Sequence, residues 1–385
     1  MVSMVAVAVP IFMSVASGEL NFSPSFVGIF VSLIYLGATA SAPVSGYIVD
    51  RFGPILISQI GLLLCALGLA LISSGSPFWM VCGALVIGSG YGPVTPASTN
   101  LLIKTTPLNM ISLVFSIKQT GVPVGGALAG AVVPLLLLSY GWRTAAMGVA
   151  GLSLISTLAI QPFRKHYDND RPEKIQFSWN QLIAPIMMAF SNQGLRPVVV
   201  ASFFFATMQL SVISYIVSYL TQDIGMTLVR AGFMLSAAQF GGIIGRIFWG
   251  VIADRFLNSR IMLGILGIAM SATAFLLAMF SAQWSHSGIL AVCILFGSVA
   301  IGWNGVYLAE VACSVKPKHT GMATGGSLFF TYCGVLIGLP VFSLIVDKTD
   351  SYPVGFFSTA ICVGICGMIL FFSRASHTRS YRIDS

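Results

Sequence analysis

Charged residues are scarce in this sequence. Asp, Glu, Lys and Arg together make up only 8% of the 385 residues, whereas hydrophobic residues make up 56% and the mean hydropathy is +0.92. A soluble domain carries about 25% charged residues, so a single water-soluble core cannot account for this composition. The shortage of charge therefore indicates a protein that spans a membrane.

Side chains suited to catalysis and metal binding are also in short supply. The four histidines, at positions 166, 286, 319 and 377, all fall in predicted loops or tails, and the seven cysteines show no zinc or redox spacing. The sequence contains no H-x-x-x-H or G-x-S-x-G motif and no intramembrane cluster of His, Asp and Glu. We therefore expect no enzyme activity, no cofactor, no metal and no disulfide framework.

Long apolar runs, by contrast, are abundant. Twelve of them come near the roughly 20 residues that a helix needs to span hydrocarbon, and short links rich in Pro, Gly or charge separate them. The predicted segments are 1–17, 25–48, 54–74, 78–103, 110–138, 143–163, 197–221, 229–252, 260–281, 288–312, 321–346 and 354–373. The first would rise only about 26 Å, so we expect the native protein to have a few more N-terminal residues.

One long polar interruption divides the twelve segments into six plus six. We predict a six-helix bundle, a central cytoplasmic loop, a second six-helix bundle and a cytoplasmic tail, at residues 1–163, 164–196, 197–374 and 375–385. Within the loop, residues 177–190 are expected to lie on the membrane surface as an amphipathic stretch. The predicted fold class is thus an all-α membrane protein with twelve transmembrane helices.

Basic residues are distributed unevenly between the two ends of the predicted helices. If the loops that follow residues 48 and 252 are cytoplasmic, fourteen Lys and Arg residues lie on that side. Only Arg143, Arg230 and Lys348 lie on the other side. This bias predicts that both termini are cytoplasmic and that the protein lies in the inner or plasma membrane. The net charge of +8 is therefore a topology signal, and no nucleic-acid partner is expected.

A short charged signal occurs twice, 204 residues apart. GYIVDRFG at 46–53 and GVIADRF at 250–256 each place a glycine four residues before an Asp-Arg pair. Each copy, which we name an Asp-Arg loop, ends one apolar segment and precedes the next. A duplicated membrane protein with charged hinges at matching points is typical of an alternating-access transporter.

With these motifs the sequence resembles the major facilitator superfamily over essentially its whole length. Glycine pairs also run in register between the two halves, namely Gly121 and Gly125 with Gly334 and Gly338, and Gly88 and Gly92 with Gly297 and Gly302. Gly-Trp-Arg at 141–143 is another common feature of that superfamily. The resemblance implies two pseudo-symmetric six-helix bundles and transport by alternating access.

The sequence departs from the superfamily pattern in two places. Pro54 and Ile55 follow Gly53, where basic residues are usual. Ala84 stands where helix 4 commonly carries an arginine associated with proton-coupled export. Both departures weaken the case for proton-driven drug efflux of the usual kind.

Charged residues near the predicted cytoplasmic helix ends are candidates for gating. They are Asp50, Arg51, Arg246, Asp254, Arg255 and Glu310. Asp50 and Asp254 can each cap a neighbouring helix N-terminus or meet a cation, and Glu310 is a natural partner for Arg246 or Arg255. The resemblance implies that such pairs latch the cytoplasmic side; the alternative is that they only set topology.

Lys118 is the outlier among the charged residues. It falls about 12 Å from the cytoplasmic end of its segment, and no carboxylate lies at a matching depth in the others. A cation at such depth is costly and almost always faces a cavity or a partner. An unpaired Lys118 in a central cavity suits an anionic substrate. The alternatives are that its side chain snorkels to the interface or pairs with Glu310.

Other polar and aromatic residues at mid-depth are candidates to complete this pocket. They are Tyr35, Gln119, Gln209, Tyr215, Gln239, Trp303, Asn304 and Tyr332. Aromatic and amide groups around one cation suit a small organic acid with an apolar body. Each of them can equally serve as a helix-packing hydrogen bond, and Gln119 and Asn304 are the stronger candidates.

The sequence therefore predicts a secondary or facilitative transporter of a small organic anion, such as a carboxylate. We expect it to work as a monomer in the lipid bilayer by alternating access. The alternatives are an exporter of neutral hydrophobic compounds or drugs, and a sensor on the same fold. Three forms of coupling stay open: facilitated diffusion, anion exchange, and co-transport in which Lys118 and the substrate share a proton.

Overall fold

The computed structural model describes residues 1–20, 26–168 and 180–373 of the chain. Within these ranges it contains helices and no strand, as expected for a chain that must satisfy its backbone groups inside lipid. The predicted tail at 375–385 and part of the predicted central loop, 169–179, lie outside the described residues.

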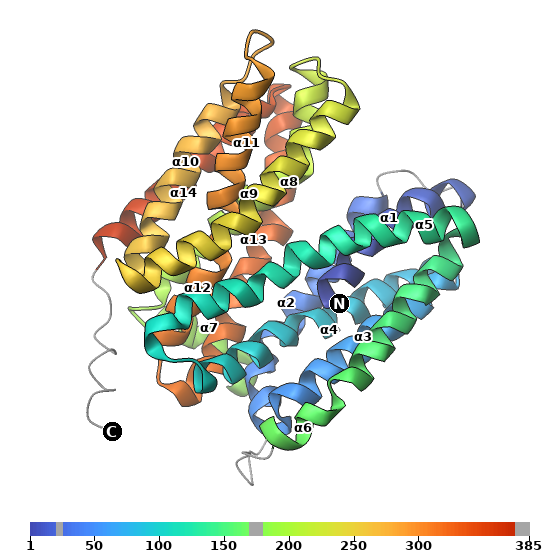
Figure 1. Cartoon of the computed structure of the whole chain (residues 1–385), viewed down its shortest axis with the longest axis vertical. Coiled ribbons are helices and arrows are strands. Elements are labelled where there is room, and N and C mark those ends of the chain that lie inside the picture. The colour runs from blue at the N-terminus through green and yellow to red at the C-terminus, as the bar shows by residue number, and fades with distance from the viewer. Residues whose placement is uncertain (21–25, 169–179, 374–385) are drawn as a thin grey trace. The chain divides into compact units, whose positions relative to one another are not determined.

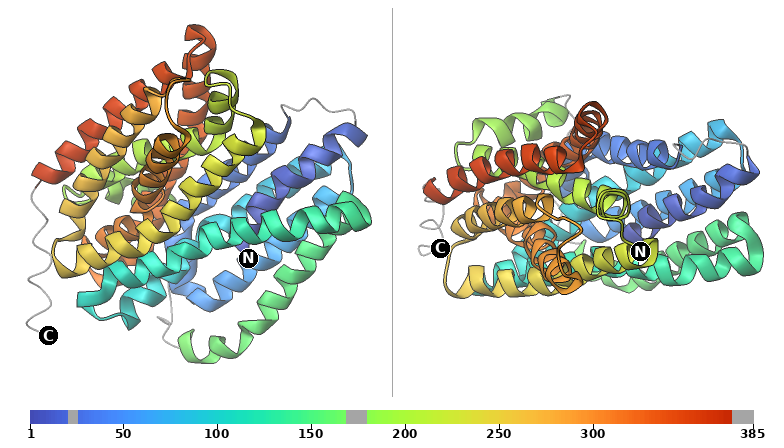
Figure 2. Two further views of the ribbon diagram at one scale, coloured as in Figure 1. Left: turned by 45° about the horizontal axis from the view of Figure 1, so that its top comes forward. Right: turned by 90° about the horizontal axis from the view of Figure 1, so that it is seen from above.

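The helices follow the apolar runs of the sequence closely. In chain order they are α1 (Val2–Glu19), α2 (Phe26–Phe52), α3 (Pro54–Ser73), α4 (Pro77–Thr105), the 3-10 turn η1 (Leu108–Met110), α5 (Ile111–Ala159), α6 (Gln161–Tyr167), α7 (Asn180–Ser191), α8 (Arg196–Gln222), α9 (Leu228–Arg255), α10 (Ser259–Ala278), α11 (His286–Ala300), α12 (Trp303–Cys313), η2 (Pro317–His319), α13 (Thr320–Thr349) and α14 (Tyr352–Phe372). Figure 1 shows their arrangement, and Figure 2 shows the same ribbons from two further directions.

Nine helical spans in the described part of the chain are long and apolar enough to cross a membrane, and α11 with α12 counts as one of them. The other three predicted segments correspond to α1 and to the two arms of α5. The apolar part of α1, Val2–Met13, is shorter than the other spans. The arms of α5, Ile111–Gly130 and Leu135–Ala159, are bent by 100°. The predicted all-α membrane fold is confirmed, and the described spans are consistent with twelve helices.

Helix α5 also contains a kink at the predicted link 140–143, within the arm Leu135–Ala159. Gly141 has φ 76° and ψ 167°, which no helix contains and which an L side chain rarely adopts. Glycine at this position lets the chain leave one helix and begin the next without an intervening loop. The next residue, Trp142, is buried.

The chain divides into two compact units. Unit 1 comprises residues 1–105, 121–188 and 317–329, and unit 2 comprises residues 106–120 and 189–316 together with the described residues from 330 on. Each unit thus contains one short segment from the opposite half of the sequence. The predicted boundaries of the two six-helix bundles stay a prediction.

Each unit is built from helices that pack side by side. In unit 1, α2, α3 and α4 form one group (Figure 1). In unit 2, α9 packs on α11, and α10 packs on α14. Close approach of α9 and α11 depends on Gly241 and Gly245, because a Cβ at either position would collide with the carbonyl oxygen of Ile294 or Ser298. This contact brings Arg246, the next residue of α9, against the end of α11.

Candidate functional site

The start of α5 is held by the second Asp-Arg loop. Asp254 Oδ1 accepts from the Ser112 backbone N–H at 3.0 Å, and Oδ2 accepts from that of Leu113 at 2.7 Å. These are first-turn N–H groups, which have no partner inside their own helix. Capping a neighbouring helix is one of the two contacts predicted for Asp254. Its role in gating stays a prediction.

Small residues bring α5 close to two other helices of unit 2. A Cβ at Gly250 of α9 or at Gly305 of α12 would collide with the side chain of Ser116. The third turn of α5, which carries Lys118, is therefore fixed against both helices. The backbone at Lys118 therefore has little freedom to move away from α9 and α12.

The Lys118 ammonium is buried and makes no hydrogen bond to any residue that the structure describes. The alternative pairing with Glu310 is not found, and a buried Nζ is not the exposed head group of a snorkelling lysine. An ammonium without an acceptor away from water is among the most costly arrangements in a protein. Within residues 1–20, 26–168 and 180–373, no hydrogen-bond acceptor compensates this charge.

A second cation lies next to Lys118. The Arg246 side chain is 2% exposed. Its Nε donates to the Ile301 carbonyl at 2.9 Å, and its Nη1 donates to the carbonyl of Gln119, the residue that follows Lys118. Arg246 thus ties α9 both to α5 and to the end of α11. We name Lys118 and Arg246 the cation pair.

The helix that faces α9 is interrupted at this level. Helix α11 ends at Ala300 and α12 begins at Trp303. Two side chains of α9 donate to carbonyls at the interruption: Arg246 to Ile301, and Trp249 Nε1 to Ser298 at 2.8 Å. Broken helices often mark substrate sites in transporters. The predicted single segment at 288–312 corresponds to one apolar span, His286–Cys313, and residues 301–302 separate α11 from α12 within it. Gly302 before Trp-Asn is the signal that could have indicated this break.

An amide cluster adjoins the interruption. Gln209 Oε1 of α8 accepts from Trp303 Nε1 at 2.9 Å and from Asn304 Nδ2 at 3.2 Å. Asn304 Nδ2 also lies 3.4 Å from the Ile301 carbonyl that Arg246 binds. Gln209, Trp303 and Asn304, here named the amide cluster, are thus linked to the cation pair through one carbonyl oxygen.

The other predicted pocket residues are distributed differently. Tyr35 belongs to unit 1, where its ring meets that of Tyr91 edge-on at 6.5 Å. Tyr215 stacks among aromatic rings of α13 and α14. Gln239 is half-buried on α9, and Tyr332 is buried on α13. The structure therefore links the Gln119 backbone to the amide cluster through Arg246 and the Ile301 carbonyl.

The first Asp-Arg loop makes its contacts inside unit 1. Asp50 Oδ1 accepts from Asn100 Nδ2 of α4 at 2.9 Å. Arg51 Nη1 donates to the Tyr47 hydroxyl at 2.6 Å. Asn100 was not among the predicted site residues, and only its place near the predicted inner end of α4 could have indicated it.

Glu310 has a different partner from the one predicted. Its Oε1 accepts from Arg260 Nε at 2.8 Å, and both side chains are buried. Of the predicted partners, Arg246 donates to the Ile301 and Gln119 carbonyls, and the guanidinium of Arg255 lies over the Phe256 ring at 5.7 Å. Arg260, the first residue of the predicted segment 260–281, lies at the start of α10 beside Glu310.

Asp168 is a buried carboxylate that the sequence did not single out. Its two oxygens accept from the backbone N–H groups of Ile55 and Leu56, each at 2.9 Å, and its residue is 2% exposed. It therefore caps α3 in unit 1 as Asp254 caps α5 in unit 2. Pro54 at the first position of α3 was a sequence signal for a helix start in need of a cap.

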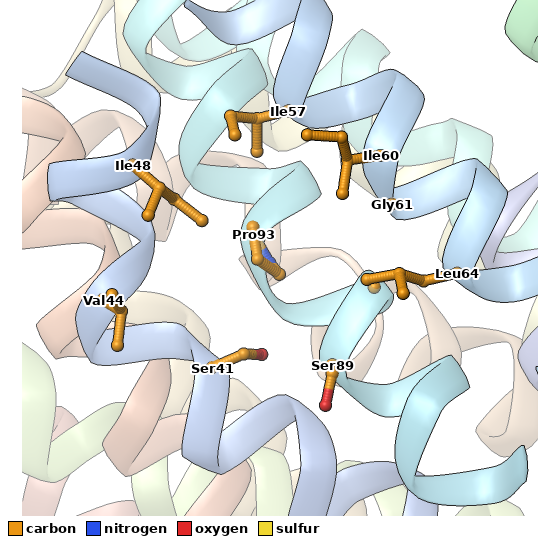
Figure 3. Close-up of a pocket in the computed structure, with 10 residues that line it drawn as sticks. Ser41, Val44, Ile48, Ile57, Ile60, Gly61, Leu64, Ser89 and Pro93 are labelled. Carbon is orange, nitrogen blue, oxygen red and sulfur yellow. The ribbon is translucent and has the colours of Figure 1, made fainter. Parts of the chain in front are cut away.

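Unit 1 also contains a pocket, of a different character (Figure 3). A cavity of about 160 Å³ lies between α2, α3 and α4. Figure 3 shows its mostly aliphatic wall, with Ile48, Ile57 and Leu64 pointing into it. Ser41 and Ser89 bond to carbonyls of their own helices. No charged side chain lines this pocket, so it does not suit an anion.

Comparison with known proteins gives a consistent result. A family model described as Major Facilitator Superfamily matches residues 1–325. A probable sulfoacetate transporter of Cupriavidus necator is 22% identical, over 90% of this chain and 84% of that protein. The membrane sensor protein UhpC of Salmonella typhimurium is 25% identical, over 92% of this chain and 84% of that protein. The solved structure of the E. coli fucose:proton symporter superposes with a TM-score of 0.73 at 18% identity, covering 97% of both chains.

Proposed function

The chain belongs to the Major Facilitator Superfamily, and from this premise we propose that it transports a small organic anion, such as a carboxylate, with Lys118 as the counter-ion. As a member of that family it is a membrane transporter and not an enzyme. The observation that carries the proposal is the buried Lys118 ammonium without a hydrogen-bond acceptor in the described chain.

Two acidic side chains on the helices that pack against the start of α5 have partners of their own. Glu310 forms an ion pair with Arg260, and Asp254 accepts two backbone hydrogen bonds at the start of α5. Neither is the described counter-ion of Lys118. An anion that enters the site would supply the missing negative charge, and its affinity would come from relief of the uncompensated cation.

The amide cluster supports a substrate with a second polar group. Gln209 Nε2 and Asn304 Oδ1 make no hydrogen bond to the residues described, although the opposite ends of both amides do. One donor and one acceptor are therefore available next to the Ile301 carbonyl. The Trp303 ring, packed against Phe205 at 5.5 Å, adds an apolar surface. A short acid with a hydroxyl, carbonyl or amide substituent suits this combination.

The way in which Arg246 is bound suggests how binding is transmitted. It holds the carbonyl after Lys118 with one nitrogen and the carbonyl at the α11 interruption with another. Lys118 belongs to α5, which Arg246 joins to α9. A substrate that attracts Lys118 therefore acts on both helices. In this proposal Asp50, Arg51, Asp254 and Arg255 form the gate at the predicted cytoplasmic end, with Glu310 restrained by Arg260.

The name of one relative supports an anionic substrate, and the name of another leaves a second candidate function. One relative is named as a probable transporter of sulfoacetate, an organic anion. Another is named as a membrane sensor. A sensor would bind the same anion without moving it. Flux into sealed vesicles separates the two functions, because only a transporter equilibrates the labelled anion across the bilayer.

Thermal stabilisation of the purified protein tests the proposal. A panel of small carboxylates, neutral drugs and organic cations is added to the wild type, Lys118→Met, Lys118→Arg and the control Lys348→Met. A ligand of the folded state raises its melting temperature by mass action. We expect a carboxylate to stabilise the wild type and the control, and to have no effect on Lys118→Met. Stabilisation by neutral compounds that persists in Lys118→Met would contradict the proposal and favour export of such compounds.

A further inference from the structure

Arg230 is one of the few basic residues on the predicted outer side, and neither the topology nor the proposed transport site accounts for it. It lies in the first turn of α9 and lines an open cavity of about 640 Å³ at the surface of unit 2. Three residues of α9 and three of α11 line this cavity, namely Arg230, Phe233, Met234, His286, Ser287 and Leu290. A volume of this size is within the range of small-molecule pockets.

The polar wall of the cavity is basic. Arg230 Nη1 lies 3.1 Å from His286 Nε2. Arginine is always protonated, so Nη1 donates this hydrogen bond and the imidazole nitrogen accepts it. Arg230 forms no ion pair with a carboxylate in the described ranges of the chain, and no acidic residue lines the cavity. Its charge is therefore balanced by no neighbouring side chain.

Two helices also begin at this cavity. The Thr227 hydroxyl caps α9 by accepting from the Arg230 N–H at 3.4 Å, and the Ser285 hydroxyl caps α11 by accepting from the Gly288 N–H at 3.1 Å. The positive ends of both helix dipoles therefore add to the charge of Arg230. The rest of the lining is apolar and comes from Phe233 and Met234 of α9 and Leu290 of α11. Phe233 is exposed and Met234 is buried.

We propose that this cavity is a second binding site for an organic anion, separate from Lys118. Arg230 binds the oxyanion, His286 positions the guanidinium, and Phe233, Met234 and Leu290 hold an apolar body. Two sources supply this chemistry: a free organic acid from the aqueous phase, and the headgroup of an anionic lipid with its chain along the apolar wall. The site is independent of the proposed function, because none of its residues touches the cation pair.

Calorimetric titration with benzoate tests the site in the full-length protein, reconstituted in nanodiscs of phosphatidylcholine. Lys118→Met removes the proposed transport site, so any benzoate binding that persists in this variant comes from elsewhere. We expect Lys118→Met to retain benzoate binding, and Lys118→Met/Arg230→Gln to weaken it about tenfold or more, as for loss of a charged hydrogen bond. Lys118→Met/Lys348→Gln is the matched control, since Lys348 is exposed on the same predicted side, and it should bind like Lys118→Met.

Two results would overturn the inference. One is complete loss of benzoate binding in Lys118→Met alone, which would leave the transport proposal intact. The other is unchanged residual binding in Lys118→Met/Arg230→Gln. Lys118→Met/Arg230→Lys guards against misfolding, because it keeps the charge and should retain most of the binding. Repeating the titration in phosphatidylglycerol nanodiscs distinguishes the sources: competition identifies the lipid headgroup, and unchanged affinity identifies the free acid.

Discussion

Unit 1 and unit 2 bury different kinds of side chain. Among the described residues, the buried charged side chains of unit 2 are Arg246, Arg260 and Glu310, and the Lys118 ammonium is buried there as well. Unit 1 buries the carboxylate of Asp168, which serves a helix start. Its pocket is aliphatic, whereas the interior of unit 2 holds the cation pair and the amide cluster.

This difference indicates a division of tasks within a pseudo-symmetric fold. Both units solve the same structural problem with a capping aspartate, Asp168 for α3 and Asp254 for α5. Among the described residues, only unit 2 adds buried cations, namely Arg246, Arg260 and the Lys118 ammonium. Because such charges are costly in a membrane protein, they are expected to be functional. The comparison predicts that charge removal in unit 2 alters binding and transport, and that comparable changes in unit 1 alter stability alone.

The largest effect is expected from breaking the ion pair of unit 2. Glu310→Gln leaves the buried Arg260 guanidinium without its carboxylate. Removal of one partner of a buried pair costs about 3–5 kcal/mol. We expect a corresponding loss in the free energy of unfolding, measured by chemical denaturation in detergent.

The double variant Arg260→Met/Glu310→Met is the control for this prediction. It removes both charges, and replacing a buried pair by apolar residues is often neutral. The double variant should therefore be more stable than Glu310→Gln. If the two are equally destabilised, the pair is not the source of the effect.

The two capping aspartates offer a matched comparison between the units. Asp168→Asn and Asp254→Asn each keep the size of the side chain and remove its charge. The asparagine amide has one acceptor oxygen in place of two, so one charge-assisted hydrogen bond and the interaction with the helix dipole are lost, which costs about 1–2 kcal/mol. We expect both variants to lose this much stability in thermal unfolding. Only Asp254→Asn should also slow flux into vesicles, because α5 carries Lys118. Equal flux in the two variants would contradict the division of tasks.

A smaller loss is expected at the outer contact of unit 1. Trp142 Nε1 donates to Glu19 Oε2 at 2.7 Å, and the Arg143 guanidinium lies over the Trp142 ring at 4.5 Å. Trp142→Phe removes the hydrogen bond but keeps an aromatic ring, so we expect a loss of about 1 kcal/mol. Anion-induced stabilisation should match that of the wild type. A reduced response to the anion would show that unit 1 takes part in binding.

Most of the fold could be predicted from the sequence because lipid restricts the alternatives. A chain in hydrocarbon must form helices, so apolar runs mark their positions, as for 260–281 against Ser259–Ala278. The family resemblance is confirmed by the match over 1–325. Lys118 was identifiable for a related reason, since a charge in an apolar run is conspicuous at any position. The cap by Asp254 followed from its place at a helix end.

The contacts that sequence reasoning missed depend on directions around the helix axes. Depth in the membrane can be counted along a segment, but the neighbour that a side chain faces cannot. Arg246, Arg255 and Arg260 all lie near the predicted inner end, and depth alone could not select Arg260 for Glu310. Asp168 is separated from Ile55 by 113 positions, and it lies in the predicted central loop. The hydrophobic periodicity of the helices does not extend into that loop, so it could not indicate this contact.

The smallest effect is expected in the aliphatic pocket of unit 1. Val44→Ile adds one methyl group to a wall of the 160 Å³ cavity. Because the space is open and apolar, the added group should gain contacts without strain and stabilise the protein by about 0.5 kcal/mol. Flux and anion binding should stay unchanged, since no charged residue lines this pocket. A change in anion affinity without a change in melting temperature would mean that the pocket of unit 1 communicates with Lys118. In that case the buried charges of unit 2 would mark the place where the anion binds, but residues of unit 1 would also respond to its binding.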